Sequence, residues 1–584
     1  MGTVSGISSG DQHMTRGIDY SLVAVILAAT FMQLLDVSIV NVAIPAIQAN
    51  LDASFGAIEL VVAGYQLTFA VTLITASRLG DAYGRKRLFV VGMAGFTLAS
   101  AICGAAPNST ALIIARLAQG LFSGLMFPQV LSIIQVSFEG ELRSRVFGIY
   151  GAVIGLATVT GPLAGGLLIK ANIWHLDWRL IFYVNVPIGL LALLGATRRL
   201  SESRSSQRPE VDYRGALIAT TGLSMLIFPL LEGRELGWPA WMKVMAALSL
   251  LVLVVFGLQQ VRASRRSKET LVNVELVASR GFLSGLALFL VFFLGVAPFF
   301  FALLIFLQDG NGFTPLVAGL TSAPFAIGAI LASLLSTRFR PSLAKVFMLA
   351  GSFLLIVAMV LLIVLLGNVA GQLSGYRLVP ALLLAGVGLG LFVGPASALL
   401  MVRVKASQTG SASGLIATFQ QIGGALGVAL ISLVFFSFLG YNAPGSARSQ
   451  LPVVTNELKA LAIPQSFIAE GESAFVTCIH DRANAKNLNS LPESCLIIGG
   501  AIEQAPIAAA LKAKLIALFI SNGNDAAGSD FLLSLRETLG YEIAVFTVAV
   551  VLTLAMPGWP RAEENQALPI DASNSDRDDA SRSD

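Results

Sequence analysis

Charged residues are scarce in this chain of 584 residues. Only 12% of them are Asp, Glu, Lys or Arg, whereas soluble domains carry roughly 25%. Hydrophobic residues make up 55%, and the mean hydropathy is +0.78. A water-soluble core would not need so many apolar runs of bilayer length, which is roughly 20 residues. The composition therefore excludes an ordinary soluble protein and indicates a chain that lies mostly in lipid, where an ionised side chain is costly.

Other absences narrow the function. The formal net charge is only +4, and the basic residues are spread over many short loops, so the footprint of a nucleic-acid-binding protein is missing. His13, His175 and His480 are scattered and no nucleophile constellation accompanies them, so neither an enzyme nor a metal site is expected. No Gly-x-x-x-x-Gly-Lys-Ser/Thr loop is present, which argues against ATP hydrolysis as an energy source. We expect no cofactor.

Fourteen membrane helices are predicted, because backbone groups in lipid must bond within their own segment. The stretch 1–19 is polar and does not read as a cleavable signal peptide. Approximate cores of the predicted helices are 20–47, 55–77, 88–106, 110–136, 145–169, 178–198, 213–232, 241–261, 282–307, 315–336, 344–367, 377–402, 413–440 and 541–557.

The distribution of basic residues sets the orientation. With the N-terminus in the cytoplasm, most Lys and Arg of the short loops fall on the cytoplasmic side. The short outer loops then hold only Lys170, Arg179, Arg234, Lys243 and Arg377. We therefore predict a multi-pass protein of the bacterial cytoplasmic (inner) membrane with both termini in the cytoplasm.

The chain is predicted to form two related six-helix bundles separated by an inserted two-helix hairpin. Glycines recur in the same order in spans 4 and 12 and in spans 5 and 13, which indicates parallel repeats with a substrate path between them. The expected units are a cytoplasmic tail (1–19), an N-terminal bundle (20–198), a linker with helices 7 and 8 (199–281), helices 9 to 13 of the C-terminal bundle (282–440), an extracytoplasmic loop subdomain (441–540), helix 14 (541–557) and a disordered cytoplasmic tail (558–584).

The external loop contains an apolar stretch at 505–519 whose lysines argue against insertion. We interpret it as an amphipathic helix that either covers a small core of its own or binds a membrane surface or a partner. Cys478 and Cys495 lie in the same loop, and an oxidising compartment permits a disulfide between them. Cys103 lies in an apolar segment and is expected to be a packing residue.

Two opposite charges stand out within the predicted spans. Asp36 lies about 16 residues into span 1, and Arg116 about 6 residues into span 4, which runs the other way. They therefore reach comparable depth, and a pair or a water-linked network between them is expected. An intramembrane acid is a functional candidate by default, although a static structural ion pair is the alternative. No acid is expected deep in a span of the C-terminal half, where Asp309 falls at a helix end.

A basic, glycine-punctuated turn connects spans 2 and 3. Gly80 and Gly84 permit tight turns, Asp81 can accept from helix-end amides or from an arginine, and Arg85 and Lys86 hold the membrane surface. The turn either contributes to a cytoplasmic gate or serves only to set the topology.

With these residues, the chain resembles the major facilitator superfamily, specifically its fourteen-spanner drug/proton antiporter family. The turn between spans 2 and 3, the span-1 run around Asp36 and the span-4 run around Arg116 carry the resemblance. The entry to span 6 is also similar, at Trp178–Gly189. Span 5 is similar to the antiporter motif of the family at Gly148, Gly161, Pro162, Gly165 and Gly166.

The resemblance implies proton-coupled efflux of small organic compounds or drugs by alternating access, with Asp36 and Arg116 in proton coupling. The expected lack of deep acids in the C-terminal half favours hydrophobic compounds. A proton symporter that imports a solute is the alternative, and a membrane sensor or scaffold is a second one. The expected partners are the small-molecule substrate, protons and the lipid bilayer, with a periplasmic adaptor protein as a further candidate. Nucleic acid is not expected.

Overall fold

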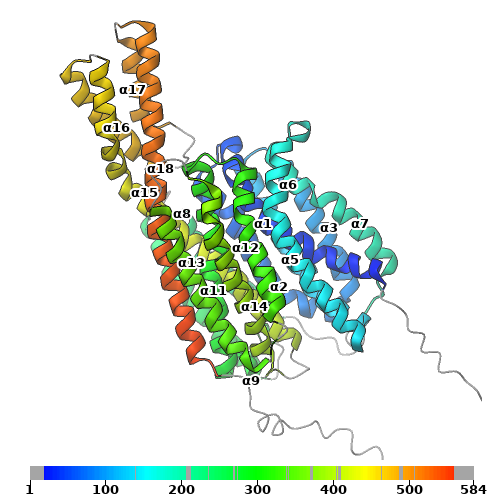
Figure 1. Ribbon diagram of the computed structural model, residues 1–584. Coiled ribbons are helices and arrows are strands. Elements are labelled where there is room, and N and C mark those ends of the chain that lie inside the picture. The colour runs from blue at the N-terminus through cyan, green and yellow to red at the C-terminus, as the bar shows by residue number, and fades with distance from the viewer. Residues whose placement is uncertain are drawn as a thin grey trace, which may run out of the picture.

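The computed structural model describes residues 19–557, except 139, 205–211, 234–235, 267–269, 273, 337–338, 340, 368–372, 403, 405–408, 462, 486–490 and 506. The side chains of some further residues within helices lie outside this description. The predicted tails, apart from Asp19, also lie outside it. The described chain is a bundle of long helices from one end of which a helical extension projects (Figure 1).

The fourteen predicted spans are confirmed. Thirteen segments of the described residues are long and apolar enough to cross a bilayer, and α5 adds a helix of 32 residues. The spans are formed by α1 (Tyr20–Leu51), α2 (Phe55–Tyr83), α3 (Arg85–Gly104), α4 (Ser109–Ser137), α5 (Gly140–Ala171), α6 with α7 (Leu180–Tyr183 and Asn185–Arg199), α8 (Tyr213–Glu232), α9 (Ala240–Arg265), α11 (Arg280–Ile305), α12 (Pro315–Ser336), α13 (Ala344–Gly367), α14 (Val379–Met401), α15 (Thr409–Ala460) and α18 (Ala509–Ala555).

Short elements join or extend these spans. Single 3₁₀ turns, η1 (Ile173–His175) and η2 (Asp177–Arg179), precede α6, and a π-helical turn, η3 (Phe306–Gly310), continues α11. The remaining short elements are α10 (Val274–Ala278), η4 (Pro341–Leu343) and η5 (Gly375–Leu378). Several helices begin at a side chain that accepts from the first free amides, as Asp19 does from Ser21 and Leu22.

Basic residues mark the end of the bundle at which α1 begins. Arg199 at the end of α7 lies 3.4 Å from Asp19 at the start of α1. Lys86, just after the α2–α3 turn, donates from Nζ to the carbonyl of Thr197 at 2.9 Å. We call this the basic end, and we call the opposite one, from which the extension projects, the extension end.

The two bundles repeat the same close helix crossings. Within the N-terminal bundle, a Cβ on Gly120 of α4 would collide with the carbonyl oxygen of Tyr65 in α2. Within the C-terminal bundle, a Cβ on Gly386 of α14 would collide with the carbonyl oxygen of Phe325 in α12. Glycine is needed at both positions because the helix backbones are in contact. The same crossing thus occurs in both bundles, as the order of glycines in the sequence predicts.

The inserted hairpin of α8 and α9 packs on the outside of this pair of bundles. Leu253 of α9 fills the space beside Gly222 of α8, and α8 in turn contacts α2 and α15. The other side of α9 exposes Leu250, Leu251 and Val254. In a membrane these side chains contact lipid.

The bundles contact each other near the extension end. The amide of Gln308 in η3 donates to the carbonyl of Val42 in α1 at 3.1 Å. Gly166 of α5 lies against the backbone of Leu316 in α12, and a Cβ there would be 2.5 Å from the Leu316 Cα. Phe55 of α2 packs on Phe436 of α15 with ring centroids 4.0 Å apart. These contacts join the two bundles at the extension end.

The loop predicted at 441–540 is helical, and it is formed largely by α15 and α18, which continue beyond the bundle. Helix α15 continues to Ala460, α16 (Gln465–Asn484) and α17 (Glu493–Gln504) follow, and α18 begins at Ala509 and enters the bundle without a break (Figure 1). The stretch predicted as a separate amphipathic helix is thus the first part of α18. A small apolar core holds the extension together, formed by Val454, Leu458, Ile468, Leu515 and Leu518.

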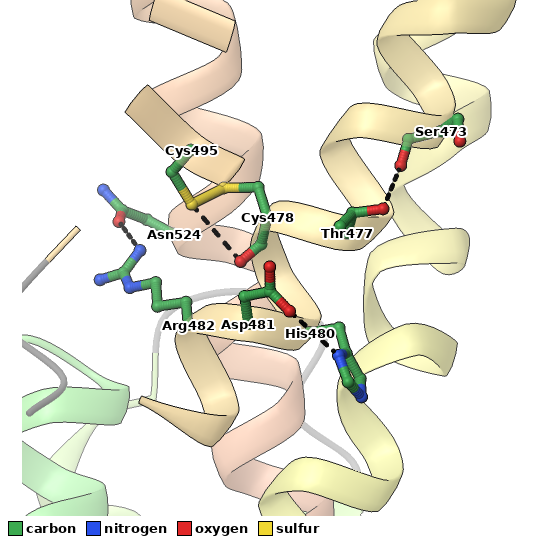
Figure 2. Close-up of a disulfide and its surroundings, with 8 residues drawn as sticks. All are labelled: Ser473, Thr477, Cys478, His480, Asp481, Arg482, Cys495 and Asn524. Atoms are coloured by element: carbon green, nitrogen blue, oxygen red, sulfur yellow. Dashed lines mark hydrogen bonds and ion pairs between the residues drawn. A yellow bond between two sulfur atoms is a disulfide. The ribbon is translucent and has the colours of Figure 1, made fainter. Parts of the chain in front are cut away.

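A disulfide joins Cys478 of α16 to Cys495 of α17. Arg482, one turn after Cys478, reaches Asn524 of α18 (Figure 2). The bridge spans 17 residues of chain, and closing a loop of this size stabilises a fold by about 3 kcal/mol in the chain-entropy model. Cys103, in contrast, is a free and buried thiol.

Gly386→Ala should lower the melting temperature of the purified protein by several degrees, because overpacking of a tight contact costs about 1–3 kcal/mol. Gly257→Ala is the matched control, since no atom lies within 4 Å of a Cβ built there. Fluorescence-monitored melting in detergent measures both. Equal melting temperatures for the two variants would show that α12 and α14 do not cross this closely.

Alkylation of the denatured, unreduced protein should modify Cys103 alone, and prior reduction should expose Cys478 and Cys495 as well. Mass spectrometry of the peptides counts the modified sites, and Cys478→Ser should leave Cys495 reactive without reduction. Modification of all three cysteines in the unreduced wild-type protein would exclude the disulfide.

Candidate functional site

A buried ion pair lies in the middle of the N-terminal bundle. Asp36 is close to the midpoint of α1, and Arg116 lies in the second turn of α4. The Nη1 atom of Arg116 donates to Oδ2 of Asp36 at 2.5 Å. The exposed fraction is 0% for Asp36 and 1% for Arg116. The structure thus brings together the two charges that the sequence placed at similar depth.

Two amides complete the surroundings of the carboxylate. Gln119, one turn after Arg116, donates from Nε2 to Oδ1 of Asp36 at 2.8 Å and accepts from Arg116 at 2.8 Å. Asn185, the first residue of α7, donates to the same Oδ1 at 3.3 Å. Both oxygens of the carboxylate therefore accept hydrogen bonds, and the donors come from α4 and α7.

The guanidinium of Arg116 is held independently of the acid. Its Nε donates to the carbonyl of Val61 in α2 at 3.0 Å. Its Cζ lies 4.2 Å from the ring centre of Tyr65 and 5.8 Å from that of Phe182, within the range of cation–π attraction. Four spans, formed by α1, α2, α4 and α6 with α7, thus contribute to one polar cluster.

The energetics of this cluster follow from its burial. Removing two charges from water costs several kcal/mol per ion, and only good geometry and further hydrogen bonds recover that cost. Both conditions are met here, because the aligned pair is joined by the two amides and the Val61 carbonyl. Loss of either partner would leave a charge uncompensated.

Helix α5 connects this cluster to the contact between the bundles. Gly161 packs against Ser38, which lies two residues after Asp36, and a Cβ on Gly161 would be 2.6 Å from the Ser38 Cβ. One turn later, Gly165 contacts Ile39, and Gly166 contacts Leu316 of α12. Pro162 lies against Gly319 of α12. The surroundings of Gly148 lie outside the described residues.

The predicted turn between spans 2 and 3 is a near-continuous helical corner. Helix α2 extends to Tyr83 and α3 begins at Arg85, so Gly84 alone makes the turn, with a φ of 111°. That value requires glycine. Gly80 lies within α2 and packs against the side-chain amide of Gln129 in α4, which a Cβ at this position would displace.

Glu202, which follows α7, accepts a hydrogen bond from the first turn of α3 at this corner. The Glu202 carboxylate accepts from the backbone amide of Lys86 at 3.1 Å and lies 3.7 Å from Arg87. The backbone amide of Arg85 donates to the carbonyl of Ser203 at 3.1 Å. The segment that follows α7 therefore binds the N-terminus of α3. The side chain of Asp81 lies outside the described residues.

Gln119 and Asn185 were not predicted from the sequence as partners of the ion pair. Gln119 carries a detectable signal, because a polar side chain one turn from an intramembrane arginine shares its face of the helix. Asn185 is part of the run at the entry to span 6, but only the fold shows that it meets Asp36.

The expectation that the C-terminal half has no acid deep in a span is wrong. Glu542 of α18 is fully buried, at 0% exposure. The predicted start of span 14 at 541 placed this residue at a helix end. Helix α18 instead begins at Ala509 and is already inside the bundle at Glu542.

The comparisons with known proteins agree with the fold. The family model of the Major Facilitator Superfamily matches residues 26–219 and 213–428. A bacterial homologue of the lysosomal transporter Spinster, solved in an inward-facing conformation, superposes with a TM-score of 0.56 at 16% identity, covering 93% of this chain and 98% of that one. A D-xylose–proton symporter gives a TM-score of 0.51 at 14% identity, covering 71% and 90%.

Relatives of higher identity are named as a transporter or as drug resistance proteins. The probable actinorhodin transporter of Streptomyces coelicolor is 35% identical over 547 residues, which is 93% of each chain. A puromycin resistance protein of Streptomyces alboniger is 35% identical over 70% of this chain and 80% of its own. The multidrug resistance protein Stp of Mycobacterium tuberculosis is 32% identical over 70% of this chain and 74% of its own.

Arg116→Met should destabilise the protein by about 3–5 kcal/mol, because it leaves Asp36 buried without its counter-charge. The double variant Asp36→Asn with Arg116→Met should regain most of that loss, since no ion remains in the cluster. Melting of the purified proteins in detergent tests this, and strictly additive losses would contradict the coupling of the two charges.

Proposed function

Because the chain belongs to the Major Facilitator Superfamily, we propose that it exports small, hydrophobic organic compounds in exchange for protons. The observation that carries the proposal is the carboxylate of Asp36, which is sealed from solvent and held by Arg116, Gln119 and Asn185. A proton-coupled carrier needs an ionisable group whose protonation changes between its two states, and Asp36 is placed for this role.

The chemistry of the pair supports a proton switch. Desolvation favours the neutral acid, whereas the Arg116 guanidinium and the two amide donors favour the carboxylate. A movement that separates α1 from α4 or α7 removes donors from Asp36 and admits a proton. Protonation in turn weakens the attraction between the helices. Proton binding and helix movement are therefore coupled in both directions.

Helix α5 links the ion pair to the contacts that join the two bundles at the extension end. It contacts Ser38 beside Asp36 and, one turn later, Leu316 and Gly319 across the seam between the bundles. Opening of this end must break the α5–α12 contact and the bond between Gln308 and Val42. A shift of α1 that follows a change at Asp36 reaches both contacts directly.

The basic residues support an orientation. Arg199 and Lys86 lie at the end where α1 starts and α3 begins, and the positive-inside rule assigns this end to the cytoplasm. The extension with its disulfide then lies in the oxidising extracytoplasmic space, as a stable disulfide requires. In this orientation the extension end, where the two bundles are joined, faces outward from the bacterial cytoplasmic membrane.

The class of substrate rests on the relatives. Proteins at 32–35% identity are named for actinorhodin, puromycin and multiple drugs. These names support organic antibiotics as the compounds to test, and export as the direction.

Asp36→Asn should abolish resistance to exported drugs while the protein still inserts in the membrane. The assay is a susceptibility panel that includes puromycin, in an efflux-deficient bacterium that expresses equal amounts of each variant. Asp52→Asn makes the same chemical change at the end of the same helix, where Asp52 is the C-cap, and it should retain wild-type resistance.

Drug transport into inverted membrane vesicles completes the test. Wild-type vesicles should accumulate drug when their lumen is acidic, and Asp36→Asn vesicles should not. Undiminished gradient-driven accumulation by Asp36→Asn would refute the role of this acid. Gradient-driven transport in the opposite direction would support an importing symporter instead.

A further inference from the structure

The C-terminal bundle contains a buried acid that the mechanism above does not use. Glu542 of α18 is 0% exposed, and within the described part of the chain neither of its carboxylate oxygens has a hydrogen-bond partner. It packs against Gly295 of α11, where a Cβ would lie 2.7 Å from Oε2 of Glu542 and 2.8 Å from the ring of Phe546. The absence of a side chain at Gly295 makes room for the acid.

Glu542 lies well inside the bilayer region. It precedes Ala555, the last residue of α18, by 13 residues, which corresponds to about 20 Å of helix. Lys345 binds the carbonyls of Leu554 and Met556 at that end, which fixes it at the membrane surface. The hydrocarbon region is about 30 Å thick, so the acid is embedded at a depth where unpaired charges are rare and functional.

The repeat places Glu542 at the counterpart of the Asp36 cluster. Asn185 follows Arg179 by six residues in span 6, and Glu542 follows Arg536 by six residues in span 14. Asn185 contacts Asp36 in the first helix of its bundle, and Glu542 contacts Gly295 in the first helix of its own. Each bundle therefore has a buried acid where these two helices meet, Asp36 of α1 in the first and Glu542 of α18 in the second.

The counter-charge is not repeated. In α14, the counterpart of α4, no residue is charged, and Gly386 follows the start of the helix by seven residues, as Arg116 does in α4. On the other helices that pack on α18, the nearest charged groups are at the ends: Arg280 of α11 and Lys345 of α13 at the basic end, Asp309 of η3 at the other end, and Arg448, Glu457 and Lys459 of α15 in the extension.

The charged residues of α18 nearest in sequence to Glu542 contact other parts of the chain. Glu537 accepts from Asn442 at 2.8 Å, and the guanidinium of Arg536 lies 3.6 Å from a Cβ built on Gly367. Asp530 lies three turns toward the extension, and Tyr541 is the adjacent residue. A carboxylate ion needs donors or a cation to be stable in an apolar site, and this enclosed site supplies neither.

We propose that Glu542 is a second proton-binding site of the carrier, so that the C-terminal bundle also binds and releases a proton in each cycle. The acid is neutral while α11 and α18 enclose it. It releases the proton when the helices part enough for water to reach the gap at Gly295. The inference rests on the proposed proton-coupled function, but it concerns a different group in a different bundle.

Infrared difference spectroscopy of the full-length protein in lipid vesicles tests this assignment directly. Between the wild type and Glu542→Gln, the carboxylic-acid C=O band should differ by one carboxyl equivalent that disappears as the pH is raised, and the same difference should appear when both proteins also carry Asp36→Asn. The Glu542→Gln substitution keeps the shape of the side chain. Thr553→Val is the matched control, because Thr553 is buried in the same helix and its hydroxyl donates only to Ala549.

Two outcomes overturn the proposal. One is an identical titration in the wild type and Glu542→Gln. The other is a Glu542 band that persists at every pH at which the protein stays folded, since a permanently neutral acid carries no proton. Should Glu542→Gln fail to fold, Glu542→Met replaces it in the same comparison. Because the measurement needs no substrate, its result is independent of whether Asp36→Asn transports drugs.

Discussion

The structure depends on one salt bridge that is shielded from water. Asp36 and Arg116 meet at 2.5 Å in the middle of the N-terminal bundle, where neither has appreciable contact with solvent. A charge pair in this position is stable only if several helices hold it together, and four spans do so. The same requirement makes the pair responsive, because any movement that removes one donor changes what the carboxylate can bind. The hydrogen bonds that hold Asp36 and Arg116 in place are thus also the ones whose loss changes the proton affinity proposed for Asp36.

Close helix packing transmits such a change. Glycines in α5 bring its backbone against Ser38 and Ile39 of α1 on one side and against the backbone of α12 on the other, so the residues beside the ion pair are in direct contact with a helix of the seam. The two bundles share these crossings but differ in charge. The first holds a compensated acid on α1, and the second holds an uncompensated acid on α18. If both acids bind protons as proposed, this difference makes the two proton sites of the cycle unequal.

Much of this architecture could be predicted from the sequence. Span number follows from apolar length and loop charge, and the meeting of Asp36 with Arg116 follows from their depths in helices that run in opposite directions. Three features could not be predicted. Asn185 reaches Asp36 only because α7 packs on α1. Glu202 caps α3 from a stretch that the sequence presents as a linker. Glu542 was placed at a helix end because the polar residues before it conceal the continuity of α18.

The most direct test of the central claim is to measure proton movement and drug movement in the same vesicles. Purified protein is reconstituted with a pH-sensitive dye in the lumen, and a puromycin gradient is imposed without a pH gradient. The account predicts that downhill movement of puromycin drives protons in the opposite direction, and that Asp36→Asn abolishes this proton flux. Proton flux of wild-type size in Asp36→Asn, or puromycin movement without any proton flux in the wild type, would contradict it.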